Sequence, residues 1–220
     1  MAALTHEGDV FTLDLGDGEN RFNAESLDSI EAALDEVEAA APCVLVTTAR
    51  GKIWSNGLDL EWMSEQGEAV VPFVGRVHEL LARVLEIGVP TIAVLQGHTF
   101  AAGAMLALAH DQRVMRADRG FFCLPEVDIR IPFTPGMSAL IAARLPVAAA
   151  HEAMTTGRRY GGADAAAAGI VDEALDESEV LPGALARARA VAGKDPATLR
   201  AIKQRLYGPA LEALRGPQGL

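Results

Sequence analysis

Aromatic residues and cysteines are scarce in this chain of 220 residues. Aromatic side chains make up only 5% of the sequence although half of it is hydrophobic, so we expect a core built mainly from Ala, Val, Leu and Ile. The two cysteines, Cys43 and Cys123, stand in apolar runs, without the spacing of a disulfide framework or a metal cluster. This pattern predicts free, buried thiols in a reducing compartment and no metal site.

Basic residues are outnumbered, since 19 Lys and Arg stand against 30 Asp and Glu and the net charge is −11. Nucleic acid is thereby excluded as the main partner, because phosphate binding needs a basic face. A single anionic ligand needs only a few local cations, and Arg21, Arg50 and Lys52 are the candidates for a basic rim. An ordinary solvated surface is the alternative interpretation of these three residues.

Long hydrophobic runs are also missing. No apolar stretch reaches the length that spans a membrane, and the first residues carry neither a basic region nor a long apolar run. The final residues 216–220, GPQGL, do not form a peroxisomal address. We therefore expect a soluble, cytoplasmic protein without a membrane partner. The absence of repeats and low-complexity linkers favours a single domain with a helical C-terminal appendage.

The chain is organised around residues 90–111, PTIAVLQGHTFAAGAMLALAHD. A β-rich run at 91–95 stops at Gly97, and the small residues 101–103 then open an apolar segment with helical spacing. Small side chains at a helix start let a ligand approach backbone N–H groups, which favour developing negative charge. In the competing interpretation these small residues serve only turns and packing.

Strand and helix patterns alternate along the rest of the chain, which predicts a stacked α/β fold with ligands near the carboxyl ends of strands. A helix capped by Asn23 and ended by Pro42 is predicted, and a second one runs from Val70 to near Gly88. Further predicted strands are 10–15, 43–48, 113–115, 120–123 and 170–171, and further predicted helices are 147–155, 163–168, 177–191 and 196–206. The tail from Leu214 is expected to fray.

Residues 124–136, LPEVDIRIPFTPG, read as a loop because they contain three prolines and a glycine. One carboxylate, Glu126, follows Pro125 among apolar neighbours. It either caps the next turn or is a desolvated acid–base group whose pKa burial would raise.

Three segments in this order resemble the crotonase (enoyl-CoA hydratase/isomerase) superfamily: KIWSNGLDL at 52–60, QGHTFAAGAMLALAHD at 96–111 and FFCLPEVDIRI at 121–131. The similarity extends from about Val10 to about Asp172. The resemblance implies an α/β crotonase-like (ClpP/crotonase) spiral of β–β–α units over residues 1–172. It implies a helical C-terminal oligomerisation region over 173–220, in a homotrimer or hexamer. The implied ligand is an acyl-CoA thioester whose coenzyme A is part of the substrate, so no separate cofactor is expected.

The resemblance also implies a site. In the family, two backbone N–H groups form an oxyanion hole for the thioester oxygen, and matching the motifs places them on Leu58 and Ala102. The second position is typically glycine, and the alanine here keeps its N–H but narrows the site. The residues expected to contact the substrate are Arg21, Lys52, Asn56, Gly57, Gly103 and Met105.

The catalytic residues depart from the hydratase pattern. Family hydratases use two glutamates, of which the first falls on Met105 and the second is present as Glu126. Hydration suits two carboxylates, whereas moving a double bond from position 3 to position 2 needs one base that carries a proton from C2 to C4. The chain most resembles the short Δ3-Δ2-enoyl-CoA isomerases of fatty acid β-oxidation, which implies that Glu126 is the proton shuttle.

Alternatives remain at this stage. Another crotonase-type activity, such as an atypical hydratase, a hydrolase or a lyase, would use the same oxyanion hole. A non-catalytic acyl-CoA-binding subunit is a different class, and an α/β domain with an unrelated ligand is a third. His98 is a conceivable second base, although a histidine in a turn is more often structural. Asp59 and Asp111 are expected to cap or orient the two loops.

Overall fold

The main sheet has six strands, and all of them except the first run parallel to their neighbours. The computed structural model describes residues 2–219. In sheet order the strands are β1 (Ala3–Glu7), β2 (Val10–Asp14), β4 (Val44–Thr48), β7 (Thr91–Leu95), β9 (Gln112–Arg116) and β11 (Glu173–Leu175). The first two form an antiparallel hairpin. The central strands are apolar on both faces, as expected for parallel strands that are covered on both sides.

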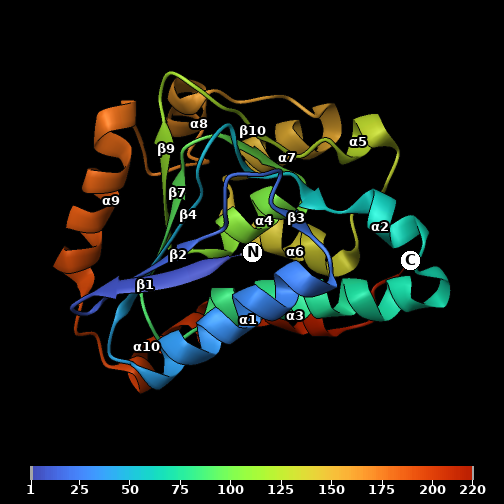
Figure 1. Cartoon of the computed structure of the whole chain (residues 1–220). Helices are drawn as coiled ribbons and strands as arrows, with labels where there is room; N and C mark the ends of the chain where they lie inside the picture. The colour runs from blue at the N-terminus through green and yellow to red at the C-terminus, as the bar shows by residue number, and fades with distance from the viewer. Residues whose placement is uncertain (1, 220) are drawn as a thin grey trace.

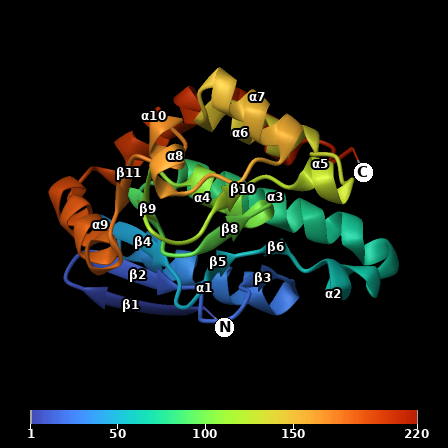
Figure 2. The same cartoon turned by 90° about the horizontal axis from the view of Figure 1, so that it is seen from above.

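Two small sheets hold the short strands that follow the main ones. One consists of β10 (Phe122–Cys123), β8 (His98–Phe100) and β5 (Ile53–Ser55), and the other of β3 (Arg21–Phe22) and β6 (Gly57–Leu58). Figure 2 shows the three-stranded sheet in the middle of the molecule, between α1 (Ala24–Ala39) and α7 (Val147–Thr156).

Each turn of the chain passes from the main sheet to a small sheet and then into a helix. The successive turns are β2–β3–α1, β4–β5–β6 with α2 (Leu60–Ser64) and α3 (Val70–Glu86), β7–β8–α4 (Ala102–Ala109), and β9–β10–α5 (Glu126–Ile129). A 3₁₀ turn, η1 (Gly67–Ala69), precedes α3. This repetition confirms the predicted spiral of β–β–α units. It brings the loops after β5, β8 and β10 to one side of the molecule.

The remaining helices follow the spiral. They are α6 (Pro135–Arg144), α7, α8 (Gly162–Ala167), α9 (Glu177–Val191), α10 (Pro196–Leu206) and α11 (Gly208–Arg215). Figure 1 shows α9 along one face of the main sheet and α1, α3 and α4 toward the other. Alternation along the strands builds a separate core on each face, with Val44 and Val46 packed toward α9 and Leu45 toward the larger core. Because β11 and α9 complete the main sheet and its cover, the predicted boundary at residue 172 falls inside this layer.

Helix α4 lies at the centre of the larger core. Every residue from Ala102 to Ala109 is buried, and none of them is charged. A helix that is apolar all round belongs in a protein interior, which explains why this segment lacks the amphipathic pattern of α1 and α3. Arg144 donates to the carbonyls of Leu108 and His110 and so satisfies the carboxyl end of α4.

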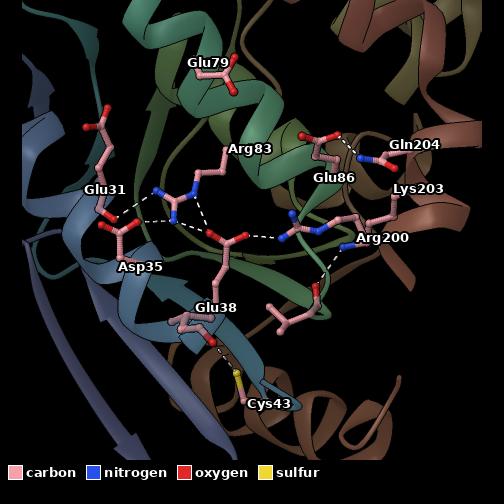
Figure 3. Close-up of polar contacts among 12 residues, drawn as sticks. Glu31, Asp35, Glu38, Cys43, Glu79, Arg83, Glu86, Arg200, Lys203 and Gln204 are labelled. Carbon is pink, nitrogen blue, oxygen red and sulfur yellow. Dashed lines mark hydrogen bonds and ion pairs between the residues drawn. The ribbon is translucent and has the colours of Figure 1, made fainter. Parts of the chain in front are cut away.

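Ion pairs tie the C-terminal helices to the spiral. Figure 3 shows Arg83 of α3 between Asp35 and Glu38 of α1, while Arg200 of α10 reaches the same Glu38. On the buried side of α10, Lys203 donates to the carbonyl of Val89 at 3.0 Å. These contacts fix the position of α10, whereas most stabilisation comes from apolar burial, since exposed pairs contribute little.

Three predicted segments are wrong in detail. Residues 124–136 are not all loop, because α5 begins at Glu126 and α6 begins at Pro135, where Thr134 caps the helix and proline suits its first turn. The predicted strand 170–171 is a turn, since the Ile170 amide donates to the Ala165 carbonyl and pairing begins only at Glu173.

The predicted fraying of the tail is also wrong for residues 214–215. Leu214 is 1% exposed and belongs to α11, which packs against α3 and α6. The last residue of that tail, Leu220, lies outside the described residues. The prediction for the cysteines agrees with the structure, in which Cys43 and Cys123 are free and buried. Among residues 2–219, no helix combines the length and the apolar character needed to cross a membrane.

Candidate active site

A cavity of about 390 Å³ opens where β6, α4 and α5 meet. Leu58, Ala102 and Glu126 all line it, so the spiral brings together the three positions at which the sequence predicts the chemistry. Most of the remaining wall is apolar, including Met63, Val74 and other side chains of the α2–α3 region. Arg21 and Glu126 are the lining residues with ionisable side chains. The site therefore offers one carboxylate to an apolar ligand.

Glu126 is buried at the first position of α5, with only 6% of its surface exposed. Its Oε2 atom has no hydrogen-bond partner within the described part of the chain. Desolvation by the apolar surroundings raises the pKa of Glu126 from 4.5 to about 7, against a smaller lowering effect of its own backbone amide. A carboxyl group that titrates near neutral pH is suited both to remove and to return a proton.

The amide of Leu58 points away from its own small sheet. Asp59 donates its amide to the carbonyl of Phe22. Because alternate residues of a parallel ladder turn to opposite sides, the N–H of Leu58 faces away from β3. Leu58 also lines the cavity, and this direction agrees with the predicted role of its N–H group as a donor.

The amide of Ala102 is the second predicted donor. Ala102 is the first residue of α4, and the N–H groups of a first helical turn have no partner within the helix. The positive end of the helix dipole adds to the attraction for an oxygen that gains negative charge. Ala101, which enters the helix, has φ 52° and ψ −128°, a backbone conformation that is strained for a residue with a side chain.

Two glycines let the donor segments approach each other. A Cβ on Gly57 would lie 2.7 Å from the Ala102 amide nitrogen, so β6 passes directly beside the start of α4. A Cβ on Gly103 would lie 2.6 Å from the Cβ and Oγ atoms of Ser55 in β5. Both glycines therefore set the distance between the backbones that carry the two donors.

The six residues predicted to contact the substrate divide into two groups. Arg21, Asn56 and Met105 line the cavity, whereas Lys52, Gly57 and Gly103 are not among its lining residues. Met105 is 1% exposed and lies one helical turn after Ala102, so the position of the first hydratase glutamate presents a thioether to the cavity and not a carboxylate.

Of the three cations predicted to form a basic rim, only Arg21 lines this cavity. Arg21 is at the cavity and pairs with Glu19 at 2.5 Å, with Asp59 at 3.8 Å. Arg50 lies outside this cavity and pairs with Asp14 at 2.7 Å.

The other polar candidates have structural contacts. Asp59 caps α2 by accepting from the Trp62 amide, as predicted. Asp111 accepts from the Thr91 amide at 2.9 Å and pairs with Lys203, so it fixes the start of β7.

His98 is not among the residues that line the cavity. Its ring lies near the rings of Phe100 and Phe121. Desolvation, followed by the nearby Arg159, lowers the pKa of His98. These contacts fit the structural interpretation of His98 better than a role as second base.

Two parts of the cavity wall were not predicted from the sequence. The α2–α3 side chains, such as Leu60, Met63 and Val74, line the cavity only because this region folds over it. Thr134 and Met137 line it as well. The Thr134–Pro135 pair could have been recognised as the start of α6, since a threonine cap before proline is a helix-start signal. Within residues 2–219, no group of three His, Cys, Asp or Glu side chains is placed to hold a metal ion.

Comparison with known proteins identifies the family. The enoyl-CoA hydratase/isomerase family model matches residues 8–216. The peroxisomal enoyl-CoA delta isomerase 2 of Arabidopsis thaliana is 38% identical over 190 residues, which cover 81% of this chain and 79% of that protein.

Solved structures agree. An enoyl-CoA hydratase/isomerase family protein from Pseudomonas syringae has a TM-score of 0.92 at 26% identity, covering 98% of this chain and 94% of the other. Human mitochondrial delta3-delta2-enoyl-CoA isomerase has a TM-score of 0.89 at 23% identity, covering 97% and 85%, and this likeness concerns the fold alone. The chain belongs to the enoyl-CoA hydratase/isomerase family and has the crotonase fold.

Proposed function

We propose that this protein is a Δ3-Δ2-enoyl-CoA isomerase in which Glu126 works as a single proton shuttle. The observation that carries the proposal is that Glu126 is the one carboxylate among the residues lining the cavity, with its pKa raised to about 7. The name of the similar Arabidopsis protein, an enoyl-CoA delta isomerase, supports the same activity.

The reaction begins with the thioester oxygen in the oxyanion hole. The N–H groups of Leu58 and Ala102 donate to this oxygen, and their donation strengthens as it becomes an enolate. Each backbone donor of this kind contributes about 3–4 kcal/mol to transition-state stabilisation. The two donors need no reorganisation during the reaction, because β6 and α4 hold them in place.

Glu126 then moves the proton. Its ionised carboxylate removes a proton from C2 of the 3-enoyl group, and the electron pair of that C–H bond enters a dienolate that ends on the thioester oxygen. The protonated Glu126 returns the proton to C4, and the double bond now lies between C2 and C3. The enzyme ends in its starting form, so one carboxylate is sufficient.

Met105 supports isomerisation over hydration. Adding water to a 2-enoyl group needs one group that activates water and one that places a proton. Beside Glu126, the second position is occupied by a thioether, which neither takes nor gives a proton at neutral pH.

A pair of assays tests the proposal. Purified protein is given a 3-enoyl-CoA and, separately, a 2-enoyl-CoA. We expect conjugation of the first substrate and no hydration of the second. Because the working base is the ionised carboxylate, kcat/KM should rise with pH up to about 7 and then level off. Hydration of the 2-enoyl-CoA would contradict the proposal, and so would binding of both substrates without turnover.

A homotrimer or hexamer is the proposed assembly. Several apolar side chains outside the core are strongly exposed in the single chain, among them Val147 at 86% and Leu206 at 65%. These side chains would be buried if another copy of the chain covered α7 and α10. The molar mass in solution, measured by light scattering, should equal three or six chains, and a monomer would refute this part.

A further inference from the structure

A buried histidine lies behind the cavity wall, outside the catalytic group. His78, in the middle of α3, is 0% exposed. Its Nδ1 atom is 3.2 Å from the carbonyl oxygen of Leu214 in α11, and its Nε2 atom is 2.9 Å from Oγ1 of Thr134. Thr134 lines the cavity, so this chain of contacts connects the acyl site with the last helix of the protein.

The contacts determine where the hydrogens are. A carbonyl oxygen can only accept, so Nδ1 of His78 carries a hydrogen and donates it to Leu214. Desolvation lowers the pKa of His78, so the ring is neutral and Nε2 is an acceptor. The hydroxyl of Thr134 therefore donates to Nε2, and its oxygen accepts from the Met137 amide at 3.2 Å.

This arrangement changes what Thr134 presents to the cavity. A free threonine hydroxyl offers a donor that would bind water or a polar ligand atom. Here its hydrogen is directed to His78, and no donor remains for the cavity. The neighbouring wall residues Val74 and Met137 are apolar. The side chains of this α3–α6 wall therefore offer no hydrogen-bond donor to the cavity although one of them carries a hydroxyl group.

Helix α11 is held closely enough to keep this arrangement. A Cβ on Gly136 would lie 2.8 Å from the Cα atom of Leu214, so the backbones of α6 and α11 are in direct contact. Leu214 is itself 1% exposed. The carbonyl that selects the Nδ1–H form of His78 is therefore fixed by packing.

We propose that His78 is a specificity-determining residue of the acyl site: by accepting the hydroxyl hydrogen of Thr134, it keeps the α3–α6 wall apolar and favours long acyl chains. Leu214 of α11 acts through His78 by selecting the tautomer that can accept. This inference rests on the proposed function in that it takes the ligand to be an acyl-CoA. It does not depend on turnover.

The test measures binding of two saturated acyl-CoAs, butanoyl-CoA and decanoyl-CoA, by calorimetry. His78→Leu leaves the Thr134 hydroxyl without its acceptor, so its hydrogen turns to the cavity and holds water there. We expect the preference for decanoyl-CoA over butanoyl-CoA to fall by roughly tenfold, in line with the effect of small changes in apolar pockets. His78→Asn, which keeps a donor for Leu214 but is too short to reach Thr134, should act in the same direction and serves if His78→Leu does not fold.

A second substitution separates this role from a loss of packing. In His78→Leu combined with Thr134→Val, no hydroxyl is left to face the cavity, so the preference for decanoyl-CoA should return. Loss of structural support alone would not be reversed by removing a further hydrogen bond.

The chain offers a matched control in His110. This residue is also buried and bridges a carbonyl and a threonine, with Nδ1 at 2.8 Å from the Leu106 oxygen and Nε2 at 2.8 Å from Oγ1 of Thr47. Neither partner lines the cavity. His110→Leu should therefore lower stability but leave the ratio of the two affinities unchanged.

The outcomes distinguish the two proposals. An unchanged ratio in the folded His78 variants, or no recovery in the double variant, overturns the role of His78 while the isomerase proposal stands. Absence of acyl-CoA binding by the unchanged protein overturns both. A changed and recovered ratio in a protein that does not convert a 3-enoyl-CoA supports the role of His78 and overturns only the isomerase activity.

Discussion

At the scale of single residues, the burial of Glu126 has two opposite consequences, one for its reactivity and one for the stability of the protein. Burial raises the pKa of Glu126 to about 7, which suits the proposed proton transfer, but an ionised carboxylate without a partner for Oε2 is costly in an apolar site. Such a loss of stability is common for perturbed groups at functional sites.

This cost predicts a pH effect on stability. The unfolded carboxyl titrates near 4.5 and the folded one near 7, so the folded chain holds a proton that the unfolded chain releases between these values. The free energy of unfolding then falls as pH rises through this window, by about 3 kcal/mol in all. Glu126→Gln does not titrate, so urea unfolding at pH 5 and pH 8 should show a smaller loss for the variant, by about 2–3 kcal/mol.

The matching control is Glu212→Gln, which removes an exposed carboxylate outside the cavity and should not reproduce the effect of Glu126→Gln. A constant difference between Glu126→Gln and the unchanged chain at both pH values would show that the carboxyl is not desolvated.

Glu126→Gln should also lose 3-enoyl-CoA turnover by about 10²–10⁴-fold, because the amide cannot carry a proton.

Ala101 gives a second prediction at this scale. Its φ of 52° with ψ of −128° costs about 1–3 kcal/mol for a residue with a Cβ, whereas glycine adopts it freely. Glycine also makes the unfolded chain more flexible, which offsets about 0.4–1 kcal/mol. Ala101→Gly should therefore raise the free energy of unfolding by about 1 kcal/mol, measured by denaturant titration.

Ala104, in the interior of α4, is the control for this substitution. There glycine relieves no strain and loses about 1 kcal/mol of helix propensity, so Ala104→Gly should destabilise the protein. If both variants were destabilised alike, the conformation of Ala101 would not be strained.

At the scale of elements, the contact between β5 and α4 sets the geometry of the proposed oxyanion hole. Gly103→Ala would place a Cβ 2.6 Å from the Ser55 side chain and 2.7 Å from its carbonyl oxygen, and the backbone of β5 cannot yield. Helix α4 must then shift and carry the Ala102 amide with it. A misplacement of about 1 Å typically costs about 10²-fold in rate.

We therefore expect Gly103→Ala to lower kcat by about 10²-fold while decanoyl-CoA binding changes much less. The comparison is Gly161→Ala, where the added Cβ meets nothing within 4 Å and turnover should be retained. Equal kcat values for Gly103→Ala and Gly161→Ala would show that catalysis does not depend on the distance between β5 and α4.

The helices and strands also show which parts of the fold could be predicted from the sequence. Long elements such as α1 and α3 were predicted because their apolar residues recur at helical spacing over several turns. The strands β3 and β6 were not predicted, because two residues cannot display a period, and β10 was predicted as the longer strand 120–123. The short helix α5 was missed for the same reason, and the prolines around it favoured a loop.

The family resemblance placed the predicted site on Leu58, Ala102 and Glu126, which follow short strands in successive turns of the spiral. The structure brings these three residues to one cavity, and their roles stay a proposal. The walls from Val74 and Thr134 come from tertiary packing of α3 and α6, and no local pattern marks them as facing a ligand. The hydrogen-bond role of His78 needed coordinates from three helices.

At the scale of the whole molecule, the C-terminal helices pack back onto the spiral core. The resemblance assigned residues 173–220 to oligomerisation, and that assignment stays a prediction. In the single chain, β11 extends the main sheet, α9 covers it, and α10 and α11 pack on α3. These residues therefore complete the core of their own chain in addition to any contact with another copy.

Removing α11 tests this integration. Deletion of residues 208–220 would expose the face of α6 and α3 that now buries Leu211 and Leu214, and would leave His78 without its carbonyl partner. Burial of each leucine side chain is worth about 1.5–3 kcal/mol, so with Ala210 the loss is about 5 kcal/mol, close to the whole stability of an ordinary domain. The truncated chain should unfold at a much lower urea concentration or fail to fold. Deletion of residues 217–220 alone leaves both leucines in place and should have little effect. If the chain without α11 unfolded cooperatively at the same midpoint as the full chain, the C-terminal region would be a separable attachment and not part of the core.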